Sequence, residues 1–256
     1  MMSHLTRAVG LLLVFPFLTI EQQPSAPPPQ RSPTGPVCGT HCGTERWAIK
    51  TLTDRQSAAA INATPQQTSV DALVALPAPP KLPQSARIAP TETQQFTVEA
   101  LLIAWKEESG PTGDRDFHLV LADPTDPGKT MIAEIPSPTC ASACASAEVD
   151  AFGAARQVLL NELGPAPATT SIVLLDPPRR VEVTGVGFFD FDHKQSGLAP
   201  NCIELHPVLH ITVMGSESGG AIPLPSGVSH TCGSRPAAGA ARPRHRPPRR
   251  PAPGTF

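Results

Sequence analysis

The chain contains no tyrosine, and aromatic side chains make up only 4% of its 256 residues. A nucleic-acid-binding surface usually interleaves basic residues with aromatic ones that stack on bases, so this composition gives such a surface little support. Two catalytic motifs are also missing from the sequence, the G-x-S-x-G turn of a nucleophilic serine and the H-E-x-x-H pair of zinc hydrolases. The motifs therefore identify no enzyme, and no catalytic residue is predicted.

Long apolar runs are missing as well. The longest, Ala8 to Ile20, has 13 residues, whereas a helix that spans a bilayer needs about 20. Arg7 supplies the positive charge that precedes the apolar core of a secretion signal. We expect a signal peptide over residues 1–26, with an uncleaved anchor as the alternative. The mature chain is then expected to be secreted, periplasmic or bound to the cell envelope, without a transmembrane helix.

Proline, in contrast, is abundant, with 32 residues beside 19 glycines. Because proline cannot continue a helix or a strand ladder, regular structure is confined to part of the chain. We expect a disordered Pro-rich linker over 27–37, an extended lead segment over 38–95 and one compact domain over 96–214. In the lead segment, Trp47 and Ile49 alternate with polar neighbours as in a short strand. Residues 215–256 are predicted to be a disordered basic tail.

The six cysteines are even in number, and in an oxidising compartment an even count indicates disulfides. Fifteen pairings are possible. A rival interpretation places the two C-x3-C pairs around zinc, although zinc knuckles more often use C-x2-C. The cysteines are Cys38, Cys42, Cys140, Cys144, Cys202 and Cys232.

Five segments show the alternation of β-strands. They cover 96–109, 116–123, 130–138, 179–191 and 202–213. A helix is predicted over 146–164, between the third and fourth strands, and Gly185 with Gly187 marks a bulge in the fourth. The fold class is therefore predicted to be mainly β, a five-stranded OB-like Greek-key barrel flanked by disordered Pro-rich segments.

The last strand carries polar residues at alternate positions. Parity places Glu204 and His206 on the face away from Ile203 and Leu205, and we expect that face to be wet. Pro207 interrupts the ladder, as in an edge strand. These polar residues are either the solvated face of the strand or part of a binding or metal site. The candidates for such a site are His118, Asp190, Asp192, His193, Glu204, His206 and His210.

Charge is unevenly distributed. Six arginines and no acid lie in residues 235–256, so the other 14 basic residues stand against 22 acidic ones. An acidic domain repels phosphate, whereas the tail could hold an anionic surface through salt-sensitive contacts or could simply be solvated. The basic tail includes Arg242, Arg244, Arg246, Arg249 and Arg250.

Four stretches carry a family resemblance: CGTERWAIKTLTD, DFHLVLAD, TMIAEIPSP and VEVTGVGFFDFDHKQSGLAPNCIELHPVL. Together, over Cys42 to Val213, they resemble a group of uncharacterised exported bacterial proteins with an OB-fold-like domain. The resemblance implies a secreted single-domain protein and a disulfide between Cys42 and Cys140, but no activity. The IELHPV stretch is also similar to the ending of some OB domains attached to secreted nucleases.

The predicted function is a ligand-binding or envelope-associated module. Its partner would be an oligosaccharide, an anionic surface or a nucleic acid, and no cofactor is predicted apart from a divalent metal as an alternative. Two other functions stay open. One is a metal-dependent hydrolase of the secreted-nuclease type, which would draw on Asp190, Asp192 and Glu204 with Arg179 or Arg180. The other is a non-catalytic structural protein of the envelope.

Overall fold

The computed structural model describes residues 38–39, 42–109 and 113–234. They belong to one of two compact units of the chain, Pro36–Phe256. The expected signal peptide, the linker over 27–37 and the arginines of the basic tail lie outside the described residues.

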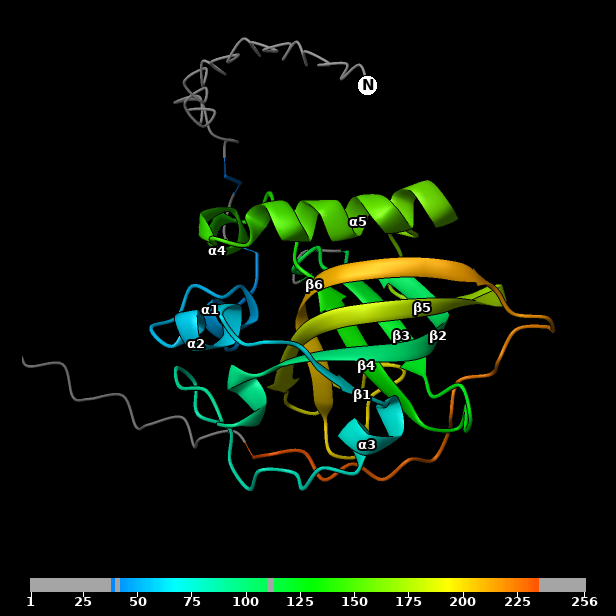
Figure 1. Ribbon diagram of the computed structural model, residues 1–256, viewed down its shortest axis with the longest axis horizontal. Coiled ribbons are helices and arrows are strands. Elements are labelled where there is room, and N and C mark those ends of the chain that lie inside the picture. The colour runs from blue at the N-terminus through cyan, green and yellow to red at the C-terminus, as the bar shows by residue number, and fades with distance from the viewer. Residues whose placement is uncertain (1–37, 40–41, 110–112, 235–256) are drawn as a thin grey trace, which may run out of the picture. The chain divides into compact units, whose positions relative to one another are not determined.

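The described part is mainly β, with one six-stranded sheet (Figure 1). The hydrogen-bonded order is β1-β2-β3-β4-β6-β5, and a further pairing of β2 with β5 turns the sheet partly into a ring. β1 pairs parallel with β2 and β4 parallel with β6, while the remaining neighbours are antiparallel. The strands are β1 (Gln66–Thr68), β2 (Gln95–Glu107), β3 (Phe117–Ala122), β4 (Thr130–Ile135), β5 (Val173–Phe189) and β6 (Ile203–Ser216).

All five predicted strands are present, but the sheet has a sixth. The short strand β1 was missed because its three residues, all polar, give no hydrophobic period. β5 begins at Val173, earlier than expected. β6 pairs with a neighbour on each side, so the expectation of an edge strand at Pro207 is wrong. The predicted bulge is confirmed, since the β5–β6 register shifts on both sides of Gly185.

One long helix, α5 (Val149–Leu163), lies across one end of the strands, and a turn of helix, α4 (Ala141–Ala145), precedes it (Figure 1). Phe152 and Leu159 of α5 are fully buried in the main core with the inward residues of the sheet. Arg156, on the same helix, lies with its guanidinium 3.5 Å from the centre of the Phe117 ring and donates to the Ile135 carbonyl. The helix predicted between the third and fourth strands is therefore confirmed.

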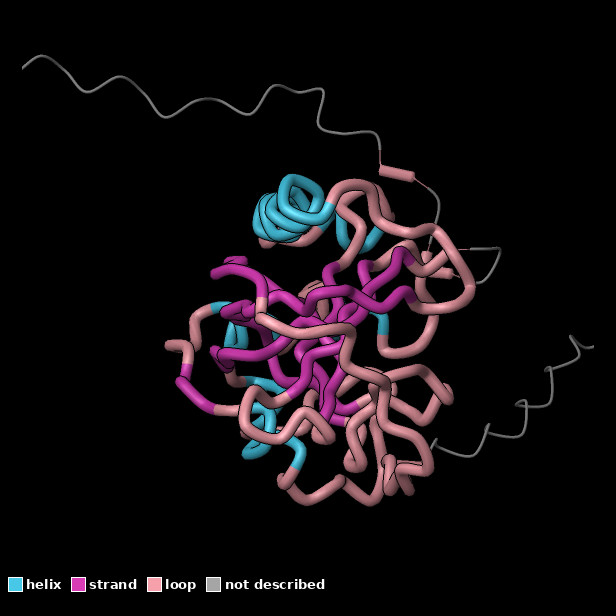
Figure 2. The backbone as a smooth tube through the Cα atoms, turned by 90° about the vertical axis from the view of Figure 1, so that its right-hand side faces the viewer, coloured by secondary structure: helices cyan, strands magenta, loops and turns pink. Residues whose placement is uncertain are grey.

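The lead segment is not extended, because it folds into short helices against the sheet. They are α1 (Trp47–Lys50), α2 (Ser57–Ile61), α3 (Val70–Val74) and the 3-10 turn η1 (Thr91–Thr93). The strand expected around Trp47 and Ile49 is wrong, because both side chains are buried from a single helical turn. An element of four residues is too short for its own periodicity to specify it, and tertiary contacts decide. Figure 2, coloured by secondary structure, shows short helical turns and long loops around the strands.

The lead segment is held by covalent and ionic contacts. Disulfides join Cys38 to Cys144 and Cys42 to Cys140, and a third joins Cys202 to Cys232. The pairing implied by the family resemblance is thus present, and the zinc interpretation is wrong because all six thiols are bonded in pairs. The three disulfides are consistent with an oxidising location. No helix among the described residues is long and apolar enough to span a membrane.

A buried salt bridge adds to this attachment. Arg46 Nη1 and Nη2 donate to the two carboxylate oxygens of Glu92 at 2.8 and 2.7 Å, and neither side chain is exposed to solvent. Arg46 also donates to the Phe189 carbonyl at the end of β5. This forked geometry fixes direction as well as distance, so it orients α1 over the sheet.

Candidate functional site

Charged side chains are buried on the face of β3, β4 and β6 opposite the main core. Glu204 and His206 are both 0% exposed. The alternation correctly predicted that both side chains point away from Ile203 and Leu205, which lie in the core. The expectation that they are wet is wrong, because Lys50 of the lead segment and Asp190 of the loop after β5 lie over that face.

The first group in this cluster joins neighbouring strands. His118 on β3 stands opposite Glu134 on β4, and His118 Nδ1 lies 3.0 Å from Glu134 Oε1. His118 Nε2 lies 3.2 Å from the Ser196 carbonyl. Both partners are acceptors, so both ring nitrogens donate and the imidazole is charged. Burial alone would lower the pKa of His118, but Glu134 outweighs it and raises that pKa.

His206 lies among three carboxylates. Its Nδ1 is 3.0 Å from Glu134 Oε2 and 3.8 Å from Glu204 Oε2, and its Nε2 is 3.3 Å from Asp116 Oδ2. Burial would lower the pKa of His206, yet these carboxylates raise it well above its usual range. Burial raises the pKa of Glu204 to about 6 despite the nearby imidazole. The cluster is therefore tightly coupled, with more acids than bases facing one another.

Lys50 and Asp190 form a second buried pair next to this cluster. Lys50 Nζ lies 2.7 Å from Asp190 Oδ2. Burial opposes ionisation of both groups, but their mutual attraction prevails, so the pKa of Asp190 is well below its usual range and that of Lys50 well above. His193 Nε2 lies 3.7 Å from Asp190 Oδ1 and 3.3 Å from Glu45 Oε2. The pair thereby links the lead segment, the loop after β5 and the cluster.

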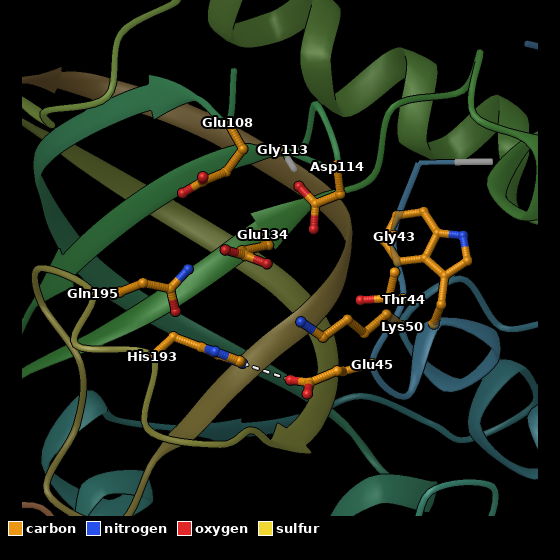
Figure 3. Close-up of a pocket in the computed structure, with 11 residues that line it drawn as sticks. Gly43, Thr44, Glu45, Lys50, Glu108, Gly113, Asp114, Glu134, His193 and Gln195 are labelled. Carbon is orange, nitrogen blue, oxygen red and sulfur yellow. Dashed lines mark ion pairs between the residues drawn. The ribbon is translucent and has the colours of Figure 1, made fainter. Parts of the chain in front are cut away.

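A pocket of about 320 Å³ opens above Glu134 (Figure 3). In Figure 3 the side chains of Glu108, Asp114, Glu134 and Lys50 point toward a common space from different elements. Burial and the charges of Asp116 and Glu134 raise the pKa of Asp114 to about 8. The lining residues are Gly43, Thr44, Glu45, Trp47, Lys50, Glu108, Gly113, Asp114, Glu134, His193 and Gln195.

Three polar atoms of the pocket wall are buried without a hydrogen bond among the described residues. One, Glu108 Oε1, has an ion-pair partner in Lys106. The other two are Trp47 Nε1, a donor, and Gln195 Oε1, an acceptor. A second pocket of about 430 Å³ adjoins the first and shares Glu108 and Gln195 with it. The wall between β3 and the loop after β5 thus offers a polar cleft with unsatisfied hydrogen-bonding groups, which is what a polar ligand requires.

The structure brings some of the predicted candidates together and leaves others apart. His118, Asp190, Glu204 and His206 belong to the buried cluster, and His193 lies at the pocket. Two candidates lie elsewhere. Asp192 pairs with Lys194 on the surface, and exposed His210 contacts only Thr212 among the interactions described.

Sequence reasoning missed five residues of the site. A signal existed for Glu134, the single acid in an otherwise apolar strand, but the His118–Glu134 pairing becomes visible only once the strand register is known. The other four lie outside or at the ends of strands, where no periodicity marks them. The missed residues are Lys50, Glu108, Asp114, Asp116 and Glu134.

No protein-family model, curated protein or solved structure matches this chain.

Proposed function

We propose that the protein is a secreted, OB-like binding module whose pocket over Glu134 takes a small hydroxylated ligand of the saccharide class. The observation that carries the proposal is the pocket wall. It combines carboxylates, an amide and the edge of an indole, and two of its polar atoms, Trp47 Nε1 and Gln195 Oε1, have no partner among the described residues. Sugar hydroxyls both donate and accept, so they can satisfy both atoms.

The order of strand pairings supports the OB-like architecture. β2, β3 and β4 follow one another, β6 returns parallel to β4, and β5 closes the order onto β2 with α5 between β4 and β5. OB-like domains use their sheet face and the flanking loops for oligosaccharides or nucleic acids. Here the flanking loops carry the pocket.

The charge of the pocket favours a sugar over a nucleic acid. Three carboxylates line it beside the carboxyl group of Asp114, which is uncharged at neutral pH because its pKa is raised to about 8, and the ammonium of Lys50 is already paired with Asp190. A phosphate would meet the carboxylates at close range, at a cost that the single His193 imidazole cannot offset. A neutral polyol meets no such repulsion. The carboxylates are those of Glu45, Glu108 and Glu134.

The test is a binding screen of the oxidised full-length chain against a glycan library and single-stranded oligonucleotides at two salt concentrations. We expect saccharide binding that is insensitive to salt. Glu45→Gln, at the pocket, should weaken it at least about tenfold, since hydrogen bonds to charged groups contribute about 1.5–3 kcal/mol. The matched control is Glu99→Gln, because Glu99 lies on β2 with a side chain that is 60% exposed. Equal binding by both variants, or oligonucleotide binding alone, contradicts the proposal.

A second candidate is a metal-dependent hydrolase. The observation in its favour is that Asp116, Glu134 and His206 offer ligand atoms within 4.8 Å of one another beside the pocket. Incubation of the protein with single-stranded DNA, RNA and oligosaccharides in the presence of divalent ions distinguishes this candidate. Product formation that disappears in Glu204→Gln supports a hydrolase, and intact substrate after prolonged incubation rejects it.

A further inference from the structure

We propose that Asp116, Glu134 and His206 form a binding site for one divalent ion of the Zn²⁺ type, behind the floor of the pocket. Asp116 immediately precedes β3, Glu134 lies on β4 and His206 on β6, and all three are buried. This inference goes beyond the proposed saccharide binding and does not depend on it.

The first step is that each carboxylate has one oxygen engaged by the protein and one turned toward His206. Asp116 Oδ1 accepts from the Ser137 backbone N–H at 3.0 Å, while Asp116 Oδ2 makes no hydrogen bond. Glu134 Oε1 is held by His118 at 3.0 Å, while Glu134 Oε2 faces His206. Partners that hold one oxygen of a carboxylate and aim the other are the usual support of a metal ligand.

The imidazole of His206 is the third member of the proposed site. Both nitrogens of His206 are completely buried and make no hydrogen bond among the described residues, although Glu134 and Asp116 oxygens lie 3.0 and 3.3 Å away. These contacts lie within ion-pair distance but are not well-directed hydrogen bonds. Glu204 next to them has neither carboxylate oxygen in a hydrogen bond. Buried polar atoms without partners are rare in native proteins, and a bound ion is one arrangement that satisfies them.

The distances between the ligand atoms can be compared with those around a zinc ion. Zinc binds imidazole nitrogen and carboxylate oxygen at about 2.0–2.2 Å with tetrahedral angles, which places two ligand atoms roughly 3.3 Å apart. The separation of His206 Nδ1 from Glu134 Oε2, 3.0 Å, falls close to this spacing. Asp116 Oδ2 faces the other ring nitrogen, Nε2, at 3.3 Å, and the three residues offer ligand atoms that all lie within 4.8 Å of one another. Two carboxylates and one imidazole fill three of the four positions of a tetrahedral ion, and Glu204 Oε2 lies 3.8 Å from His206 Nδ1.

The ligand set also selects the type of ion. Imidazole suits Zn²⁺ and other first-row transition ions, whereas Ca²⁺ and Mg²⁺ take oxygen ligands. A neighbouring group, Glu108 with His118 and Glu134, has a similar spacing but fits less well. Both nitrogens of His118 make hydrogen bonds, to Glu134 and to the Ser196 carbonyl, which a bound ion would break, whereas those of His206 make none among the described residues. Glu134 belongs both to the proposed site and to the lining of the pocket.

The experiment uses the oxidised full-length chain, stripped with a chelator and then titrated calorimetrically with Zn²⁺, Mn²⁺, Ca²⁺ and Mg²⁺ separately. We expect one Zn²⁺ per chain and weaker or no binding of Ca²⁺ and Mg²⁺. Replacement by Co²⁺ should give the intense visible bands of a four-coordinate ion. Failure of Zn²⁺, Mn²⁺ and Co²⁺ to bind the stripped wild-type chain overturns the proposal without any variant.

Variants locate the bound ion. Asp116→Asn and His206→Gln should weaken Zn²⁺ binding at least about 100-fold, the upper range seen even for groups that only support ligands. His210→Gln is the matched control, because His210 lies on the same strand but is exposed and outside the cluster. A loss of binding in His210→Gln with retention in Asp116→Asn overturns the site. Should His206→Gln not fold, Asp116→Asn and the Co²⁺ spectrum of wild type still decide.

Discussion

At the scale of the residue, the Lys50–Asp190 pair tests how the buried charges are held. Asp190→Asn removes one partner and leaves the Lys50 ammonium buried, which should lower the free energy of unfolding by about 3–5 kcal/mol. The matched control is Asp192→Asn, two residues along, whose Lys194 partner has an 81% exposed side chain, and it should cost no more than about 1 kcal/mol. Urea unfolding of both variants gives the comparison. Equal losses of unfolding free energy in the two variants would mean that the Lys50–Asp190 pair is exposed to solvent in solution.

Asp190 should also make the stability of the protein depend on pH. Lys50 holds the pKa of Asp190 below its ordinary value despite burial, so the carboxylate stabilises the fold fully above a pH of about 4. That contribution is lost as the pH falls toward and through the lowered pKa. The stability gap between wild type and Asp190→Asn should therefore be constant near neutrality and narrow below about pH 4. Thermal unfolding between pH 2 and 7 measures it, and a gap that widens in acid contradicts the assignment.

At the scale of the element, two glycines should respond to alanine with opposite signs. A Cβ on Gly185 would lie 2.9 Å from the Pro207 carbonyl oxygen and 3.2 Å from the Val208 Cα, both backbone atoms across the bulge. Gly185→Ala should cost about 1–3 kcal/mol. Gly153 on α5 has nothing within 4 Å of such a Cβ, so Gly153→Ala should stabilise the protein by about 0.5–1 kcal/mol. Chemical denaturation of both variants checks the pair, and destabilisation by Gly153→Ala would be the contrary result.

Elements also show how far the sequence can be interpreted alone. Alternation located β2 to β6 because one face of each strand is apolar, and parity placed Glu204 and His206 on the opposite face correctly. It could not show that this face is covered. The residues that cover this face belong to the proline-interrupted lead segment, more than a hundred residues earlier in the sequence. The buried Arg46–Glu92 salt bridge of that segment produces no periodic pattern in the sequence. Asp116 and Glu134 were missed for the same reason, since their importance arises from register and packing.

At the scale of the whole molecule, the disulfides should contribute unequally to stability. Cys42–Cys140 closes a separation of 98 residues and Cys202–Cys232 one of 30. In the chain-entropy model these closures are worth about 4.7 and 3.6 kcal/mol. Because Cys38–Cys144 still closes almost the same loop when Cys42–Cys140 is absent, we expect the variant that lacks both bridges, with alanine at Cys38, Cys42, Cys140 and Cys144, to unfold at lower urea than Cys202→Ala/Cys232→Ala. Intact mass before and after reduction should show six thiols appearing, and free thiols in the unreduced protein would contradict the pairing.

The lead segment that these bonds fasten is also a wall of the pocket, through Glu45, Trp47 and Lys50. Two covalent ties, from Cys38 and Cys42, join its beginning to the region of α4. A newly made chain whose sulfurs are still reduced lacks the bonds that fasten this wall. The ability of this pocket to hold a ligand would then be acquired together with oxidation of the cysteines.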